Sequence, residues 1–391
     1  APIPLFPAFP VLLCTFSHSP MRTFCHPLKS FVRATLFAAI GLVASFTLQP
    51  ARAQYAGGVW TAVPDFGFNN IDGLSSKLSQ NGQVGIFGCW GGPLFRTLDG
   101  GTTWNQTLTG ITPNGIAMSS NGQKIFLAVR DFPIHVSTNS GTNWSPVSGL
   151  ASFWADVDCS ADGLIAIACR GNTGTVHVTT NGGLNPGLTE QVIAGATNIN
   201  FVACSSDGTK RFAASSNGFI YTWDSGSGWV QRDSSRQWAG LTSSADGTKL
   251  AATVLGGNIY TSTDSGATWT SRATSQDWTR IDSTGDGSVL ITSASGLGGG
   301  LYTSYDSGVT WTARATGVAI SNPFRWRGTS VSGDGTRMLA PIGGGTVPQA
   351  LYMSDTASAR SQAPTGTDKT VFPVGGTYTF TKADFGFTDA D

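Results

Sequence analysis

The sequence predicts an all-β protein made of seven similar four-stranded antiparallel units that close into a ring. The 391-residue chain holds 51 glycines and only 12% charged residues, a composition typical of many short strands joined by tight turns. Two turn motifs alternate along the chain and recur together about every forty residues. The formal net charge of zero gives no electrostatic footprint for a nucleic-acid partner.

The N-terminal residues have the features of a processing segment. We expect residues 1–20 to be upstream sequence, because Met21 is the first plausible start. Residues 21–53 combine a cationic start, an apolar stretch and the small-residue cleavage site Ala51–Ala53, which is the pattern of a secretory signal peptide. A membrane anchor is the alternative, although the apolar stretch is short for a span. We predict a mature chain that begins near Gln54 and has no membrane span.

Four cysteines remain after such a cleavage, in a compartment that permits disulfides. They allow three pairings, and the sequence does not choose among them. Two of them fall at equivalent places in successive units, so similarity of position explains them as well as a bond does. We expect buried thiols, and the absence of a CxxC motif or a Cys/His cluster argues against zinc. The four residues are Cys89, Cys159, Cys169 and Cys204.

The first turn motif is an Asn-Gly or Asp-Gly pair after a short apolar stretch. Both residues accept the positive φ of a type I′ turn, so the pair is a strong hairpin signal. The pairs begin at Asn81, Asn121, Asp162, Asp207, Asp246, Asp286 and Asp334. The second motif follows each pair, at Asp99, Asn139, Asn181, Asp224, Asp264, Asp306 and Asp355. Matching the two series predicts seven units.

Each unit is predicted to contain four strands, with the second motif between the last two. Residues 238–244, 249–255, 258–263 and 268–273 illustrate them. The seventh unit has no recognisable fourth strand, whereas residues 57–63 form a strand with no unit of its own. We therefore expect this N-terminal strand of the mature chain to complete the seventh unit and close the ring.

The second motif resembles the Asp box, S-x-D-x-G-x-T-W, of the sialidase-like β-propeller families with BNR repeats. Two clear matches are "YTSTDSGATW" at residues 260–269 and "YTSYDSGVTW" at residues 302–311. The resemblance implies that residues 54–365 form a seven-bladed β-propeller of four-stranded antiparallel blades. The Asp in each box can accept backbone N–H bonds across the turn, so we expect a structural role. The residues with this role are Asp99, Asn139, Asn181, Asp224, Asp264 and Asp306.

Residues 366–391 have a different character, with no turn pair and no Asp box. The run "YTFTKADFGFTDAD" resembles the start of the cadherin-like, VCBS-type tandem modules of bacterial surface proteins. The resemblance implies a truncated β domain in which Asp384, Asp389 and Asp391 could bind Ca²⁺, with a solvated tail as the alternative. It also implies a longer exported protein that is secreted, on a bacterial cell surface or periplasmic. No cofactor is expected for the propeller.

Residues that depart from the repeat are the candidates for ligand binding. They fall in loops on the face opposite the repeated turns, where exposed rings beside charged groups suit a sugar or a peptide. The alternative is that the rings only fill the bases of the loops. The candidates are Trp90, Arg130, Asp131, Phe132, Arg170, Phe324 and Arg325.

No catalytic residue is predicted. The sequence lacks the R-I-P motif that the sialidase resemblance would require, and Glu190 is its single glutamate. Asp131 and Asp156 could serve another glycosidase as paired carboxylates, but nothing singles them out. We predict a non-catalytic, monomeric propeller within a longer chain, which recognises a glycan or an extracellular protein. A glycoside hydrolase and an assembly-factor-like propeller are the alternatives.

Overall fold

A computed structural model gives the structure of the chain, and it describes residues 12–15, 24–27, 60–63, 73–147, 152–184, 187–295, 299–314, 325–343 and 351–355. Every regular element in these residues is a β-strand. The chain divides into two units, residues 1–53 and residues 54–391. In the first unit β1 (Leu12–Thr15) pairs antiparallel with β2 (Phe24–Pro27). The apolar part of the predicted signal peptide and the predicted C-terminal module lie outside the described residues.

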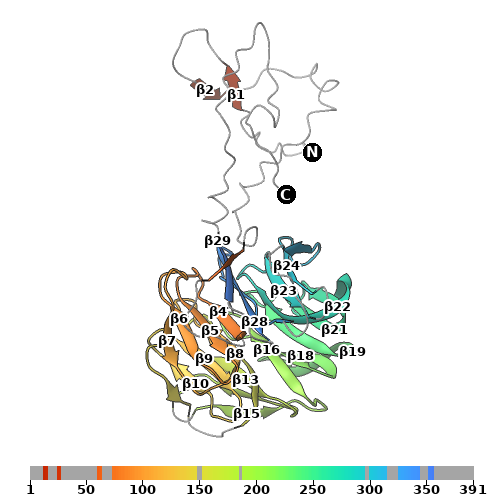
Figure 1. Cartoon of the computed structure of the whole chain (residues 1–391). Coiled ribbons are helices and arrows are strands. Elements are labelled where there is room, and N and C mark those ends of the chain that lie inside the picture. The colour runs from red at the N-terminus through yellow and green to blue at the C-terminus, as the bar shows by residue number, and fades with distance from the viewer. Residues whose placement is uncertain are drawn as a thin grey trace, which may run out of the picture. The chain divides into compact units, whose positions relative to one another are not determined.

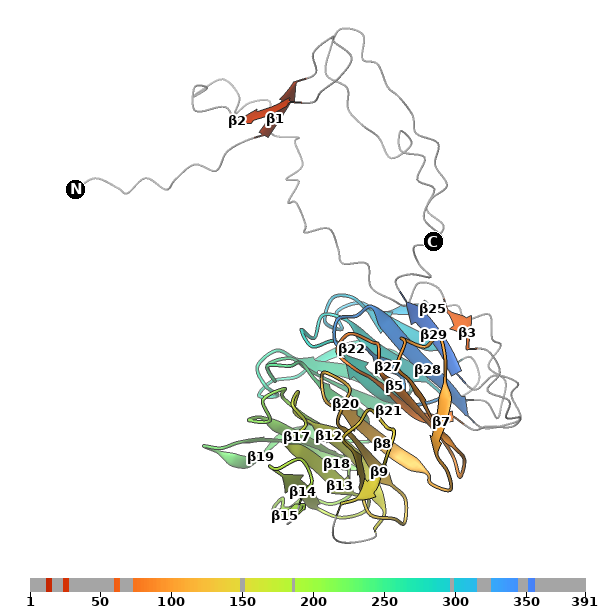
Figure 2. The same cartoon turned by 90° about the vertical axis from the view of Figure 1, so that its left-hand side faces the viewer.

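The second unit is a β-propeller whose sheets surround a common axis (Figures 1 and 2). Four of its sheets have the predicted four antiparallel strands. The first sheet contains β4 (Gly73–Leu78), β5 (Gly85–Cys89), β6 (Leu94–Thr97) and β7 (Asn105–Leu108). The second sheet contains β8 (Pro113–Met118), β9 (Ile125–Val129), β10 (His135–Ser137) and β11 (Ser145–Pro146). The third sheet contains β12 (Trp154–Cys159), β13 (Ala166–Arg170), β14 (Thr175–Thr179) and β15 (Thr189–Val192). The fourth sheet contains β16 (Ile199–Cys204), β17 (Arg211–Ser215), β18 (Gly218–Asp224) and β19 (Gly228–Arg236).

The fifth sheet has six strands and contains two of the sequence repeats. Its strands are β20 (Trp238–Ser243), β21 (Leu250–Ser262), β22 (Thr270–Ser283), β23 (Leu290–Ala294), β24 (Leu301–Ser304) and β25 (Thr312–Arg314). Strand β22 runs without a break from the outer edge of one repeat to the inner position of the next. The described propeller therefore has six sheets, and the prediction of seven separate four-stranded blades is wrong.

The sixth sheet joins the two ends of the propeller sequence. It contains β26 (Arg325–Trp326), β27 (Ser330–Val331), β28 (Arg337–Gly343), β29 (Leu351–Asp355) and β3 (Thr61–Ala62). Strand β3 pairs antiparallel with β29 over two residues, with Ala62 opposite Tyr352. Trp60 and Val63, which flank β3, are buried.

The ring itself is linked at the turns on its axis. Each Asn-Gly or Asp-Gly turn donates a backbone N–H bond to the turn of the next repeat, and Asp334 donates back to the first turn at Gln80. The acceptor carbonyls in order are those of Ser120, Ala161, Ser206, Ala245, Gly285, Gly333 and Gln80. Strands β4 and β28 lie side by side where the first and last repeats of the propeller meet (Figure 1). The axial turns make this link, so the prediction that the N-terminal strand closes the ring is not supported.

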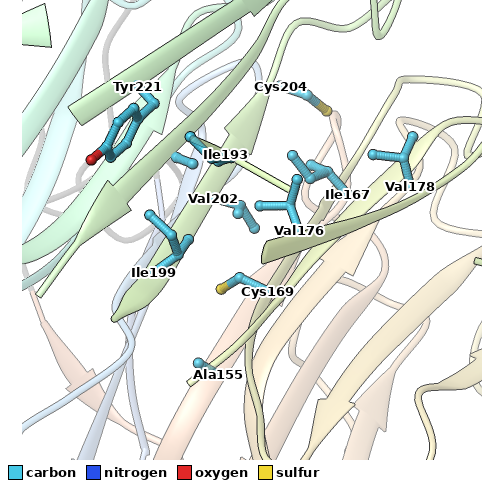
Figure 3. Close-up of a cluster of buried hydrophobic side chains, with 11 residues drawn as sticks. Ala155, Ile167, Cys169, Val176, Val178, Ile193, Ile199, Val202, Cys204 and Tyr221 are labelled. Atoms are coloured by element: carbon cyan, nitrogen blue, oxygen red, sulfur yellow. The ribbon is translucent and has the colours of Figure 1, made fainter. Parts of the chain in front are cut away.

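Apolar side chains fill the space between successive sheets. Figure 3 shows one such cluster, in which Ile167 and Val176 of the third sheet pack with Ile199 and Val202 of the fourth. Alternate residues of each strand point into this layer, as the period of two requires. The four cysteines of the described propeller are buried, and no disulfide joins them.

A second repeated contact fixes the other end of the inner strands. A ring at the start of the first strand packs edge-on against a ring of the third strand, with centroids 4.9 to 5.7 Å apart. The pairs are Trp154–His177, Trp238–Tyr260, Trp278–Tyr302 and Trp326–Tyr352. Among the described residues there is no helix with the length and apolar character needed to cross a membrane.

Candidate functional site

The Asp boxes lie at the end of the ring that also carries the Asn-Gly and Asp-Gly pairs, here called the turn end. The Asp264 carboxylate accepts bonds from the Thr268 amide at 2.9 Å, the Thr268 hydroxyl at 2.6 Å and the Ser262 hydroxyl at 2.7 Å. The bonds from Thr268 lower the pKa of Asp264 to about 2. The Trp269 indole donates to the Gly266 carbonyl at 3.0 Å, and Gly266 has a φ of 85°. These contacts engage the carboxylate within its own turn.

The other boxes vary this arrangement. Asp99 and Asp306 accept the same three bonds from their own turns. Asn139 accepts from the Asn143 amide and the Ser137 hydroxyl through its amide oxygen, and Asn181 accepts from the Thr179 hydroxyl. Asp224 instead accepts from the Gly226 and Ser227 amides.

Several predicted ligand-binding residues come together at the opposite end, here called the loop end. The Arg130 guanidinium lies between two rings, 5.4 Å from the Trp90 centroid and 5.2 Å from the Phe153 centroid. Asp131 Oδ2 lies 3.6 Å from Arg130 Nε. Trp90 and Phe132 are about half exposed. We call these five residues the Arg130 cluster; the sequence predicted four of them and missed Phe153.

Arg170 lies in the next repeat, close to the same cluster. Its guanidinium covers the Trp154 ring at 5.3 Å, and its buried Nε and Nη2 atoms have no hydrogen-bond partner in the part of the chain that the structure describes. Phe153 packs on the neighbouring Gly171, where a β-carbon would clash with its ring. Of the other predicted residues, Phe324 lies outside the described residues, and Arg325 begins β26 with its side chain undescribed.

A cavity of about 550 Å³ opens at the loop end beside the ring axis, and we call it the mouth cavity. Its wall is made by the first-strand residues of the last repeats and by the connections that precede them. Six of its lining residues are Phe201, Trp238, Trp278, Arg280, Trp326 and Arg327. Sequence reasoning missed this cavity, although a Trp recurs at the start of three of these inner strands, and an Arg follows Trp278 and Trp326 two residues and one residue later.

Arg280 forms the floor of the mouth cavity and reaches across the ring. Its Nη1 donates to Asp156 Oδ1 at 2.8 Å, and its Nη2 donates to the carbonyls of Asn114 and Ala155 at 2.8 and 3.2 Å. The acceptors belong to the second and third repeats, whereas Arg280 belongs to the sixth. Burial raises the pKa of Asp156 even though Arg280 opposes that effect. Arg280 therefore ties opposite sides of the ring together.

A second layer of charges lines the axis nearer the turn end. Lys77 Nζ lies 2.8 Å from Asp282 Oδ1, and Asp158 accepts the Cys204 amide at 2.9 Å. Burial raises the pKa of Asp158 to about 6, whereas the neighbouring acids raise the pKa of Lys77 against the effect of its burial. The period of two along β4, β12 and β22 places these residues on the axis.

The structure gives the two proposed glycosidase carboxylates different surroundings. Asp156 is buried on the axis and paired with Arg280, and Asp131 lies on an exposed loop beside Arg130. Glu190 Oε2 lies 3.8 Å from His177 Nε2, and burial together with Arg170 lowers the pKa of His177 to about 4. In the part of the chain that the structure describes, no three His, Cys, Asp or Glu residues could hold a metal ion. The predicted calcium ligands Asp384, Asp389 and Asp391 fall outside it.

Comparison with family models and with curated proteins gives no match. Among solved structures, the chain is similar to YCF48 from Cyanidioschyzon merolae, with 19% identity and a TM-score of 0.58, over 76% of this chain and 98% of that one. It is also similar to YCF48 bound to D1 peptide, with 18% identity and a TM-score of 0.55, over 76% and 95%. These likenesses show the β-propeller fold, and they do not confirm the expected membership of the sialidase-like families.

Proposed function

We propose that this chain is a non-catalytic propeller that recognises another protein by binding a polypeptide segment at its loop end. The mouth cavity carries this proposal. Its volume lies within the range of ligand sites, and it combines large apolar rings with a few polar groups, as such sites do. The walls are preformed, because the indoles of Trp238 and Trp278 are buried and each donates a hydrogen bond to a backbone carbonyl.

The Arg130 cluster extends the proposed binding surface across the loop end. Its half-exposed Trp90 and Phe132 lie on the same end of the ring as the mouth cavity but belong to the first repeats. A polypeptide in extended conformation can cover both places, because it advances about 3.3 Å per residue. The likeness to YCF48 in a complex with D1 peptide supports a polypeptide as the class of ligand.

Carbohydrate recognition is the weaker candidate. A sugar would stack on an open aromatic face, but Arg130 covers one face of Trp90. Glycoside hydrolysis has less support again, since it needs two carboxylates at the bond that is cut. The described residues that line the mouth cavity include no Asp or Glu.

We also propose that the protein works outside the cytoplasm. The signal-like residues 21–53 support this proposal. Fractionation of the producing cells, with N-terminal sequencing of the product, should find an exported chain that starts near Gln54. An uncleaved cytoplasmic chain would contradict it.

Site-specific crosslinking tests the binding function. Peptides are first selected from a random displayed library on the full chain, and a photoreactive residue is then placed at Leu255, which lines the mouth cavity and is 47% exposed. The matched control has the same residue at Val309, which is 53% exposed and lies in an Asp-box turn. We expect selected peptides to crosslink from Leu255 and not from Val309. Crosslinks from Val309 alone, or a library that yields no binder, would refute the proposal.

A further inference from the structure

We infer that the mouth cavity anchors its polypeptide through a carboxylate group, which the wall formed by the last repeat holds. This inference rests on the proposed polypeptide-binding function and adds the chemistry of the anchor. It starts from three side chains in one short segment, Trp326, Arg327 and Thr329. The first two line the mouth cavity, and the third lines the axial cavity next to it.

Each of these side chains has a buried polar atom that has no hydrogen-bond partner among the described residues. The atoms are Trp326 Nε1, Arg327 Nε and Thr329 Oγ1. The indole and guanidinium N–H groups can only donate, and the hydroxyl can donate as well. A buried donor without an acceptor loses its bond to water and gains none in return, so native proteins rarely leave several together. Three in four residues indicate a place where a ligand supplies the acceptors.

The equivalent tryptophans of other repeats show that the repeat itself does not require a free donor. Trp238 Nε1 donates to the Gly218 carbonyl at 3.0 Å, and Trp278 Nε1 donates to the Thr274 carbonyl at 3.2 Å. Trp326 packs on Tyr352 as those residues pack on their own tyrosines, and it is fully buried. The Trp326 ring, which lines the cavity, is therefore retained, while its buried N–H group has no partner among the described residues.

The charge of the cavity selects the type of acceptor. Arg280 and Arg327 line it, with no acidic residue among its described lining. Arg280 already bonds to Asp156 and two carbonyls, whereas Arg327 has no ion pair among the described residues. A carboxylate offers two oxygens and a negative charge, and a charge-assisted bond to guanidinium is about twice as strong as a neutral one. An amide oxygen would satisfy fewer donors and leave the Arg327 charge unpaired.

The carboxylate can come from an acidic side chain or from the end of a polypeptide. Arg280 crosses the ring below the cavity, so the group must enter from the loop end in either case. The two sources share the same contacts with Arg327 and Trp326. Short synthetic peptides can distinguish them.

The indole N–H of Trp326 gives a direct readout, because a new hydrogen bond moves its proton resonance. The full chain labelled with ¹⁵N is titrated with acetyl-Ala-Glu-Ala-amide, acetyl-Ala-Gln-Ala-amide and acetyl-Ala-Ala-Ala with a free carboxyl end, and Trp326→Phe assigns the signal. We expect one or both carboxylate peptides to shift the Trp326 signal at concentrations where the glutamine peptide does not. If the free-end peptide alone acts, the source is a chain end; if the glutamate peptide alone acts, it is a side chain.

Two variants test the proposed contacts without removing a buried ring. Arg327→Gln and Thr329→Val should each weaken the binding of the carboxylate peptide, and the loss of affinity should be about tenfold for Arg327→Gln. Arg272→Gln is the control, because Arg272 bonds to Thr261 in an outer strand away from the cavity. Equal shifts with glutamate and glutamine peptides, or full binding by Arg327→Gln, would overturn the carboxylate anchor. The proposed function would still stand if library peptides crosslink from Leu255, so the two failures can be told apart.

Discussion

The two ends of the ring use their polar side chains in opposite ways. At the turn end Asp99, Asp264 and Asp306 each accept three bonds from their own turns. Most buried side-chain atoms without partners in the described residues lie at the loop end, on Arg170, His177, Asn200, Trp326, Arg327 and Thr329. The turn-end exceptions, Arg211 and Arg337, have other contacts, with the Trp223 ring and the Asn81 carbonyl. The Asp-box residues bond within their own turns, whereas several loop-end side chains keep a buried polar atom without a partner among the described residues.

The largest expected effect comes from Arg280, which belongs to the loop end but is fully bonded. Arg280→Met should lower the free energy of unfolding by about 3 to 5 kcal/mol, because it leaves Asp156 buried without its counter-charge. Arg327 lines the same cavity and has no ion pair among the described residues, so the cost of Arg327→Met should be much smaller. Urea unfolding of the two variants measures both.

Adding Asp156→Asn to Arg280→Met should recover part of the loss, since the uncompensated charge is then gone. Similar losses of unfolding free energy in Arg280→Met and Arg327→Met would contradict this expectation, because the bonds of Arg280 would then add nothing to the stability of the fold.

The next effect concerns His177, which occupies the position that tyrosine holds in the other Trp–ring pairs. Its folded pKa of about 4 lies below the ordinary value of 6.5, so the unfolded chain binds more protons between these values. Its contribution to stability is present above about pH 6.5 and is lost as the pH falls through 4. His177→Tyr should remove this loss, which is on the order of 2 kcal/mol at pH 4.

Unfolding free energies of the wild type and His177→Tyr, measured from pH 4 to 7, test this expectation. Asp158 acts in the opposite direction, because its raised pKa of about 6 gives stability at low pH that is lost as the pH rises. The difference between the two proteins cancels the Asp158 contribution. A difference that does not change with pH would show that His177 is not held neutral by its surroundings.

Sequence patterns predicted the parts of the molecule that depend on local chemistry. The Asn-Gly and Asp-Gly pairs indicated the turns, and the departures from the repeat indicated Trp90 and Arg130, which the structure brings together. The continuous strand β22 was missed, because its continuity depends on how two repeats pack. The mouth cavity was missed because Trp278 and Trp326 are buried ring partners as well as cavity lining, and a sequence does not show which of their N–H groups lacks a partner.

The smallest effect tests the turn end. Asp264→Ala removes three accepted bonds from an exposed turn, so it should cost roughly 1 kcal/mol of unfolding free energy, as the loss of a side-chain cap does. Asp264→Asn should cost less, since Asn139 accepts the equivalent amide and hydroxyl bonds through its one amide oxygen. Peptide binding at the mouth cavity should stay unchanged in both variants, because the box lies at the opposite end of the ring. Thermal melting and titration of a library-selected peptide measure the two quantities on the same samples. Loss of binding with an unchanged melting temperature would mean that the Asp boxes contact the ligand. The turn end would then bind ligand as well, and its role would not be structural alone.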